Sequence, residues 1–122
     1  MARLDYAPRE NCSVSFKVTT TPTFDKQARA LARKYRSLSS DLAGLISQLE
    51  VDPELGTPLG HHCFKIRLAI KSKARGKSGG GRVITHVRII KQSVRLIAIY
   101  DKSERETLSD SELLELLKQF ES

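Results

Sequence analysis

The sequence predicts a single α+β domain in which helices pack against one face of a mainly antiparallel sheet. Its 122 residues suit one domain. Three successive segments between residues 64 and 100 alternate apolar and polar side chains, as strands do. Apolar residues recur at helical spacing both before and after these segments. The expected order of elements is therefore βααβββα.

The first expected elements are a strand over residues 14–18 and a helix that follows it. Apolar and polar residues alternate in the strand. Thr21 is a suitable N-cap, and Pro22 behind it favours the first helical position. The helix is expected to end near Ser37.

A second helix is expected antiparallel to the first, because the connection between them is short. Ser39 or Ser40 is the candidate cap, and Asp52 with Pro53 ends the helix. Its buried stripe consists of Leu42, Leu45, Ile46 and Leu49. Residues 54–62 contain two glycines and a proline and are expected to form a loop.

A three-strand meander and a last helix complete the chain. The strands are expected over residues 64–71, 82–89 and 94–100, with an exposed basic loop over residues 72–81. Ser109 and Glu112 have the spacing of a capping box. The helix behind this box has an apolar side made of Leu113, Leu114, Leu116, Leu117 and Phe120.

Basic side chains are concentrated in one third of the chain. Residues 64–105 contain twelve lysines and arginines against two acids, a net charge of +10, whereas the whole chain carries +7. This concentration favours binding to nucleic acid, because each neutralised phosphate releases counterions. A solubilising surface is the alternative, but solubilising charge usually mixes both signs. No segment has the length of an apolar membrane span. The basic residues lie on strand-like segments instead of one amphipathic helix, so a membrane partner is not expected.

Strand alternation places the basic side chains on the sheet face opposite the apolar ones. That face is expected to carry Lys65, Arg67, Lys71, Arg82, His86 and Arg88. Metal-free RNA cleavage needs such cations, together with groups that move the protons of the ribose 2′-OH and the leaving 5′-oxygen. Lys65 and His86 are the candidates for proton exchange, because arginine stays protonated at neutral pH. A half-exposed strand residue without a chemical role is the alternative for His86.

Further basic residues are candidates for holding RNA, with an ordinary solvated surface as the alternative. A stripe along the first helix recurs at helical spacing. The RNA-binding candidates are Lys26, Arg29, Arg33, Lys71, Lys73, Arg75, Lys77, Arg88 and Lys102. His61 and His62 precede the first meander strand and are placed to reach the basic face. A metal site is not expected there, because no third ligand has a suitable spacing.

Several segments resemble the RelE/ParE superfamily of bacterial type II toxins. They are FKIRLA (64–69), GKSGGGRVI (76–84) and IYDKSE (99–104), supported by ARKY (32–35) in the helical hairpin. The run over residues 77–84 is especially similar to the HigB-like branch. The resemblance spans nearly the whole chain after residue 12, and residues 1–12 are treated as a candidate flexible extension.

The resemblance implies a microbial-RNase-like fold and a ribosome-dependent mRNA endoribonuclease, or mRNA interferase, that inhibits translation. It implies a cognate antitoxin, the ribosome and mRNA as partners, operator DNA only through the antitoxin, and no cofactor. Two other activities stay open. One is a ParE-like inhibitor of DNA gyrase without nuclease activity, and the other is a degenerate toxin that only binds an antitoxin. The charged residues before position 12 do not resemble a secretory signal, so a cytoplasmic location is expected.

The resemblance assigns catalysis to basic residues on the first meander strand and to an arginine that opens the next. The matching positions are Lys65, Arg67 and Arg82. A tyrosine that some members place at the start of the last helix falls at Ser109, which is a departure. The proton donor and acceptor therefore stay open, with His86, Tyr100 and His62 as candidates.

Overall fold

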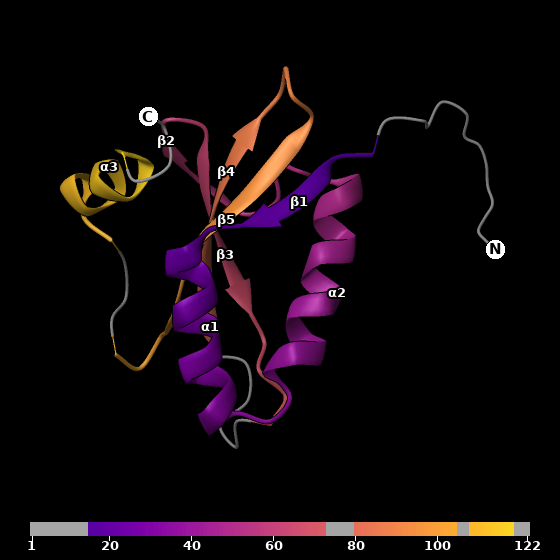
Figure 1. Cartoon of the computed structure of the whole chain (residues 1–122), viewed down its shortest axis with the longest axis vertical. Coiled ribbons are helices and arrows are strands. Elements are labelled where there is room, and N and C mark those ends of the chain that lie inside the picture. The colour runs from indigo at the N-terminus through magenta and orange to yellow at the C-terminus, as the bar shows by residue number, and fades with distance from the viewer. Residues whose placement is uncertain (1–14, 73–79, 105–107, 119–122) are drawn as a thin grey trace, which may run out of the picture.

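The structure is a computed structural model that describes residues 15–72, 80–104 and 108–118. The candidate extension over residues 1–12 lies outside the described residues, and so does most of the loop expected over residues 72–81. The elements are β1 (Lys17–Thr20), α1 (Pro22–Lys34), α2 (Leu38–Val51), β2 (Thr57–Gly60), β3 (Cys63–Leu68), β4 (Gly81–Arg88), β5 (Ser93–Asp101) and α3 (Asp110–Lys118) (Figure 1). The predicted α+β fold class is confirmed.

The strands form one sheet in the order β1-β5-β4-β3-β2. Strands β3, β4 and β5 form the expected antiparallel meander, and β1 pairs with β5 in parallel. The expectation of a loop over residues 54–62 is wrong in part, because Thr57–Gly60 pairs with β3 as the edge strand β2. Pro58 lies on this strand, and a proline is tolerated at the edge of a sheet.

The sequence correctly predicts the residue at which α1 begins but not the one at which α2 begins. The amide of Phe24 donates to Oγ1 of Thr21 at 3.2 Å, which confirms the cap of α1. Helix α1 ends at Lys34, earlier than expected, and α2 begins behind Ser37 instead of Ser39 or Ser40. The hydroxyl of Ser37 donates to Asp41 at 2.7 Å, so it joins the first turn of α2.

The sheet is covered on both faces, which corrects the expectation that the helices share one face. One core lies between the sheet and the α1–α2 pair and contains Leu31, Leu45, Val83 and Leu96. A second core lies on the opposite face, where α3 packs its Leu113 and Leu117 against Cys63, Ile84, Ile97, Ala98 and Tyr100. Figure 1 shows the sheet passing between α2 and α3. An amphipathic helix must bury its apolar side, and this face of the sheet supplies apolar partners.

An irregularity in β5 supplies part of that second apolar surface. Ile84 pairs with Ala98 while Thr85 pairs with Leu96, so Ile97 is an extra residue in β5. Such a bulge interrupts the alternation of side chains. Both Ile97 and Ala98 consequently contact the core beneath α3.

The start of α3 confirms the predicted capping box. The amide of Glu112 donates to Oγ of Ser109 at 3.2 Å, and the amide of Ser109 donates to Oε1 of Glu112 at 3.0 Å. Of the predicted apolar side, Leu113 and Leu117 are buried, and Leu114 is 41% exposed. Phe120 lies outside the described residues.

Candidate functional site

Three basic residues meet at one end of the β3–β4 pair. Arg67 lies directly opposite Arg82, and Lys65 lies two pairs further along, opposite Ile84. We call Lys65, Arg67 and Arg82 the cation cluster. Arg67 is exposed and Lys65 half-buried, whereas Arg82 is only 4% exposed. The guanidinium Nη1 of Arg82 donates to the carbonyl of Gly81 at 3.1 Å.

The cation cluster lacks neutralising acids among the residues that the structure describes. The ion pair recorded for those residues joins Lys34 to Glu104, away from the cluster. Like charges directly opposite one another destabilise a sheet, and a buried cation is costly without a charged partner. An anion that contacts Arg67 and Arg82 would offset both costs.

Helix α3 covers part of the face that the sequence analysis expects to be open. Tyr100 lies opposite Arg82 on β5 and is 8% exposed, because it belongs to the core beneath α3. The expectation of a fully uncovered basic face is therefore wrong, and the basic surface is a strip along β3. On that strand, Lys65 and Arg67 keep exposed surface.

His86 lies on the same face as Arg82 but not beside it. The two residues are four positions apart on β4, a separation of about 13 Å between Cα atoms at the usual rise of a strand. Ile84 stands between them and is fully buried under α3. The residues expected to form one catalytic group therefore fall into two groups.

The second group is a cleft lined by His61, His62 and His86, which we call the histidine cleft. Its volume is about 610 Å³, and the facing wall comes from α3 through Ser111, Leu114, Glu115, Leu117 and Lys118. A neighbouring groove of about 400 Å³ shares His62 and His86 and extends to Arg88 and Lys91. The contributions of Glu115 and Lys118 are missed by the sequence analysis, because it places α3 on the other face.

The turn between β2 and β3 presents two of the histidines in an uncommon backbone conformation. The φ angles of His61 and His62 are 56° and 62°, in the left-handed region. A two-residue hairpin with both central φ angles positive normally contains Asn and Gly. The carbonyl of His62 accepts a 2.9 Å hydrogen bond from the amide of Val87, which fixes the turn against β4.

The candidate RNA-binding residues differ in exposure. Lys26, Arg29 and Arg33 are exposed on α1, as predicted. Lys71 is exposed but lies beyond the end of β3, where its amide donates to Oδ2 of Asp41 at 3.1 Å. Arg88 and Lys102 are half-buried. Lys73, Arg75 and Lys77 lie outside the described residues.

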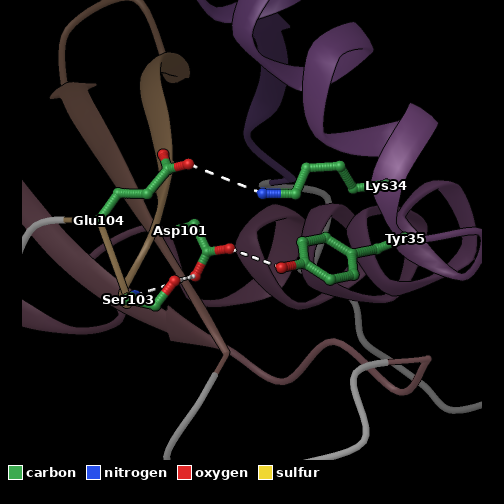
Figure 2. Close-up of polar contacts among 5 residues, drawn as sticks. All are labelled: Lys34, Tyr35, Asp101, Ser103 and Glu104. Atoms are coloured by element: carbon green, nitrogen blue, oxygen red, sulfur yellow. Dashed lines mark hydrogen bonds and ion pairs between the residues drawn. The ribbon is translucent and has the colours of Figure 1, made fainter.

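The connection between α1 and α2 is tied to the ends of two strands. The phenol of Tyr35 donates to Oδ2 of Asp101 at 2.7 Å, and Oδ1 of Asp101 accepts from the amide and hydroxyl of Ser103 at 2.9 Å (Figure 2). The amide of Ser72, behind β3, donates to Oγ of Ser37 at 2.8 Å. These contacts hold the end of the sheet nearest the cation cluster.

The residues that the structure describes contain neither a metal cluster nor a membrane-spanning helix. No group of three or more His, Cys, Asp and Glu residues in this part of the chain is arranged to hold a metal ion. None of its helices has the length and apolar character needed to cross a membrane.

Comparisons with known proteins identify a similar fold at low sequence identity. No family model matches the sequence, and no curated protein matches it. Among solved structures, the chain is similar to a mutant of the E. coli toxin RelE in the free state, with a TM-score of 0.59 and 17% identity. The match covers 88% of this chain and 99% of the RelE chain. The chain therefore has a RelE-like fold.

Proposed function

We propose that the protein is the toxin of a type II toxin–antitoxin system and acts as a ribosome-dependent mRNA endoribonuclease. The observation that carries this proposal is the cation cluster on a RelE-like fold. Arg67 faces Arg82 directly, and no acid among the described residues pairs with either of them. A phosphodiester is the anion that this arrangement suits.

The geometry of the cation cluster supports binding of an RNA backbone rather than of a single small anion. Lys65 and Arg67 are two residues apart on β3, and Arg67 is opposite Arg82, so the charges extend along the strand. Guanidinium groups bind phosphate oxygens through two parallel hydrogen bonds, which fixes a phosphate in orientation as well as position. The exposed basic stripe on α1, with Lys26, Arg29 and Arg33, gives a second surface for ribosomal RNA.

The proposed reaction uses no metal ion. A base removes the proton of the ribose 2′-OH, the resulting oxyanion attacks the adjacent phosphate, and an acid protonates the leaving 5′-oxygen. Cations stabilise the charge that builds up on the phosphate. Arginine supplies charge only, so the proton transfers require other groups, and Lys65 and the histidines are of the right type.

The proposal includes the partners of such a toxin. A cognate antitoxin would restrain the activity and would carry any contact with operator DNA, and the ribosome would present the mRNA in the cytoplasm. An acidic, partly disordered antitoxin segment would complement the net charge of +7. The HigB-like resemblance concerns the branch within the superfamily and stays a prediction.

The proposal is tested by adding the purified protein to a cell-free bacterial translation reaction and mapping mRNA 5′ ends by primer extension. New ends in register with codons, seen only with translating ribosomes, are the expected result. Intact mRNA with normal translation would contradict the proposal. A supercoiling assay with DNA gyrase would then test the ParE-like alternative.

A further inference from the structure

We propose that the histidine cleft is the proton-transfer centre of the RNA cleavage reaction, with the cation cluster holding the adjoining RNA backbone. This inference rests on the proposed function and deepens it. It assigns the acid and the base to His61, His62 and His86 and separates them from Arg67 and Arg82. The substrate class is single-stranded RNA.

The chain contains three histidines, and all three line one cleft although they come from the β2–β3 turn and from β4. Cys63, the residue after the turn, pairs with His86, so the hairpin places the turn beside that histidine. Histidine is the side chain whose ordinary pKa allows proton exchange near neutral pH. A cleft that gathers every imidazole of the chain is suited to acid–base chemistry.

His61 and His62 both have left-handed φ angles, a conformation that is unfavourable for residues with a Cβ and that Asn and Gly adopt more easily. Strained backbone of this kind concentrates at functional sites. Because packing alone would be served better by other residues, the imidazoles themselves are the reason we infer for their presence.

Charged residues surround the histidine cleft. Lys118 and Glu115 face it from α3, and Arg88 and Lys91 line the neighbouring groove that shares His62 and His86. Arg95 of β5 lies opposite His86. Lys65 of the cation cluster is two residue pairs away from His86 along the β3–β4 ladder. Of these charged neighbours, Glu115 alone is acidic and the others are cations, so the charge around the cleft favours binding of a phosphate.

The proposed step is balanced within the cleft. One neutral imidazole accepts the proton of the 2′-OH while the 2′-oxygen forms a bond to phosphorus. The bond from phosphorus to the 5′-oxygen breaks, and a second, protonated imidazole gives its proton to that oxygen. The products are a 2′,3′-cyclic phosphate and a 5′-hydroxyl, and exchange with water restores both imidazoles.

The test uses a double variant that removes two imidazoles and relieves the turn. His61→Asn with His62→Gly provides the residues that this hairpin conformation favours, so the melting temperature is expected to stay the same or rise. Ribosome-dependent cleavage is expected to fall by at least about 100-fold, the usual contribution of a positioned acid or base. His86→Gln is expected to lower cleavage to a similar degree.

The matched control is Gln92→Gly, which relieves another non-glycine residue with positive φ at a turn that contains no histidine. This control is expected to cleave mRNA like the wild-type protein. The cleavage rate of the wild-type protein, plotted against pH, should be bell-shaped. A variant that lacks one imidazole of the acid–base pair should lose one limb of this bell. If the double variant and His86→Gln both cleave mRNA at the wild-type rate and with the wild-type pH profile, the inference is overturned. The proposed function then stands. An inactive wild-type protein would overturn both.

Discussion

The hydroxyl of Tyr35, at the end of α1, donates a 2.7 Å hydrogen bond to the fully buried carboxylate of Asp101, at the end of β5 (Figure 2). The contact joins residues 66 positions apart in the chain. Beside it, Lys34 and Glu104 form an exposed ion pair at 3.7 Å. The two neighbouring interactions allow a comparison between a buried and an exposed polar contact.

Tyr35→Phe is expected to lower the free energy of unfolding by about 2 kcal/mol, because a buried carboxylate loses a charge-assisted hydrogen bond. Lys34→Gln is the matched control. It removes an exposed ion pair and is expected to change stability by less than about 0.5 kcal/mol. Urea unfolding followed by circular dichroism measures both. Equal effects of the two variants would contradict the stabilising role of the Tyr35–Asp101 contact.

The same contact predicts a pH dependence. The hydrogen bond to Asp101, assisted by burial and by the negative charges of Asp101 and Glu104, raises the pKa of Tyr35 above its ordinary value. Folding therefore favours the neutral phenol. The resulting stabilisation is complete below the ordinary tyrosine pKa of about 10 and is lost as the pH rises through the higher value of the folded protein.

As the pH becomes more alkaline, the free energies of unfolding of wild type and Tyr35→Phe are expected to converge. Below a pH of about 9 the difference between them should be constant. Titration by ultraviolet absorbance should show a late ionisation in the wild-type protein that is missing from Tyr35→Phe. The absence of this late phase would contradict the raised pKa.

Two glycines of the chain are expected to respond oppositely to alanine. Gly44 lies within α2, where an added Cβ would meet no atom within 4 Å. Gly56 has a φ of 104°, and its added Cβ would lie 2.5 Å from the carbonyl oxygen of Lys65. Gly44→Ala should therefore raise the free energy of unfolding by about 0.5 to 1 kcal/mol, because alanine is the better helix former.

Gly56→Ala should be destabilising, since it combines an unfavourable φ with a backbone clash on β3. Thermal unfolding of both variants gives the comparison. A Gly56→Ala protein as stable as the wild type would show that the turn before β2 relaxes freely, contrary to this expectation.

The cap of α1 gives another stability prediction. Oγ1 of Thr21 accepts from the amide of Phe24, and Thr21 is itself buried. Thr21→Ala should cost about 1 kcal/mol, whereas Thr21→Ser should keep most of the cap. Chemical unfolding of the two variants is the measurement, and equal losses would indicate that the methyl group, not the hydroxyl, matters at this position.

Local signals in the sequence predict much of the fold. Pro22 behind a threonine and the spacing of Ser109 and Glu112 identify two helix starts, because caps depend on neighbouring residues only. The side of the sheet that α3 covers depends on contacts distant in sequence. Helical periodicity shows that α3 has an apolar side but does not show what covers it. Strand β2 is missed because Pro58 and two glycines are typical of a turn.

The candidate site is predicted only in part for the same reason. Alternation correctly places Lys65, Arg67, Arg82 and His86 on one face, as the strand register shows. It does not predict that Arg82 is buried or that His86 joins the histidines of the β2–β3 turn. Both features depend on α3 and on a hairpin turn in an uncommon conformation.

The cation cluster predicts a salt dependence of RNA binding. If Arg67 contacts a phosphate, Arg67→Gln should weaken binding to single-stranded RNA of any sequence and reduce the slope of log K against log salt by about 0.7, the contribution of one phosphate contact in a single strand. Lys17→Gln is the matched control, because Lys17 is exposed on β1, at the opposite edge of the sheet from β2.

Fluorescence anisotropy with a labelled oligonucleotide at several salt concentrations measures the slope. Since Arg67 is exposed and lies opposite the like charge of Arg82, its replacement is expected not to lower the melting temperature, so a weaker complex would report a lost contact and not unfolding. Equal slopes for wild type, Arg67→Gln and Lys17→Gln would contradict a phosphate contact at Arg67. If Arg67→Gln and Lys17→Gln reduce the slope equally, RNA binds a diffuse positive surface. A local site at Arg67 would respond to Arg67→Gln and not to Lys17→Gln.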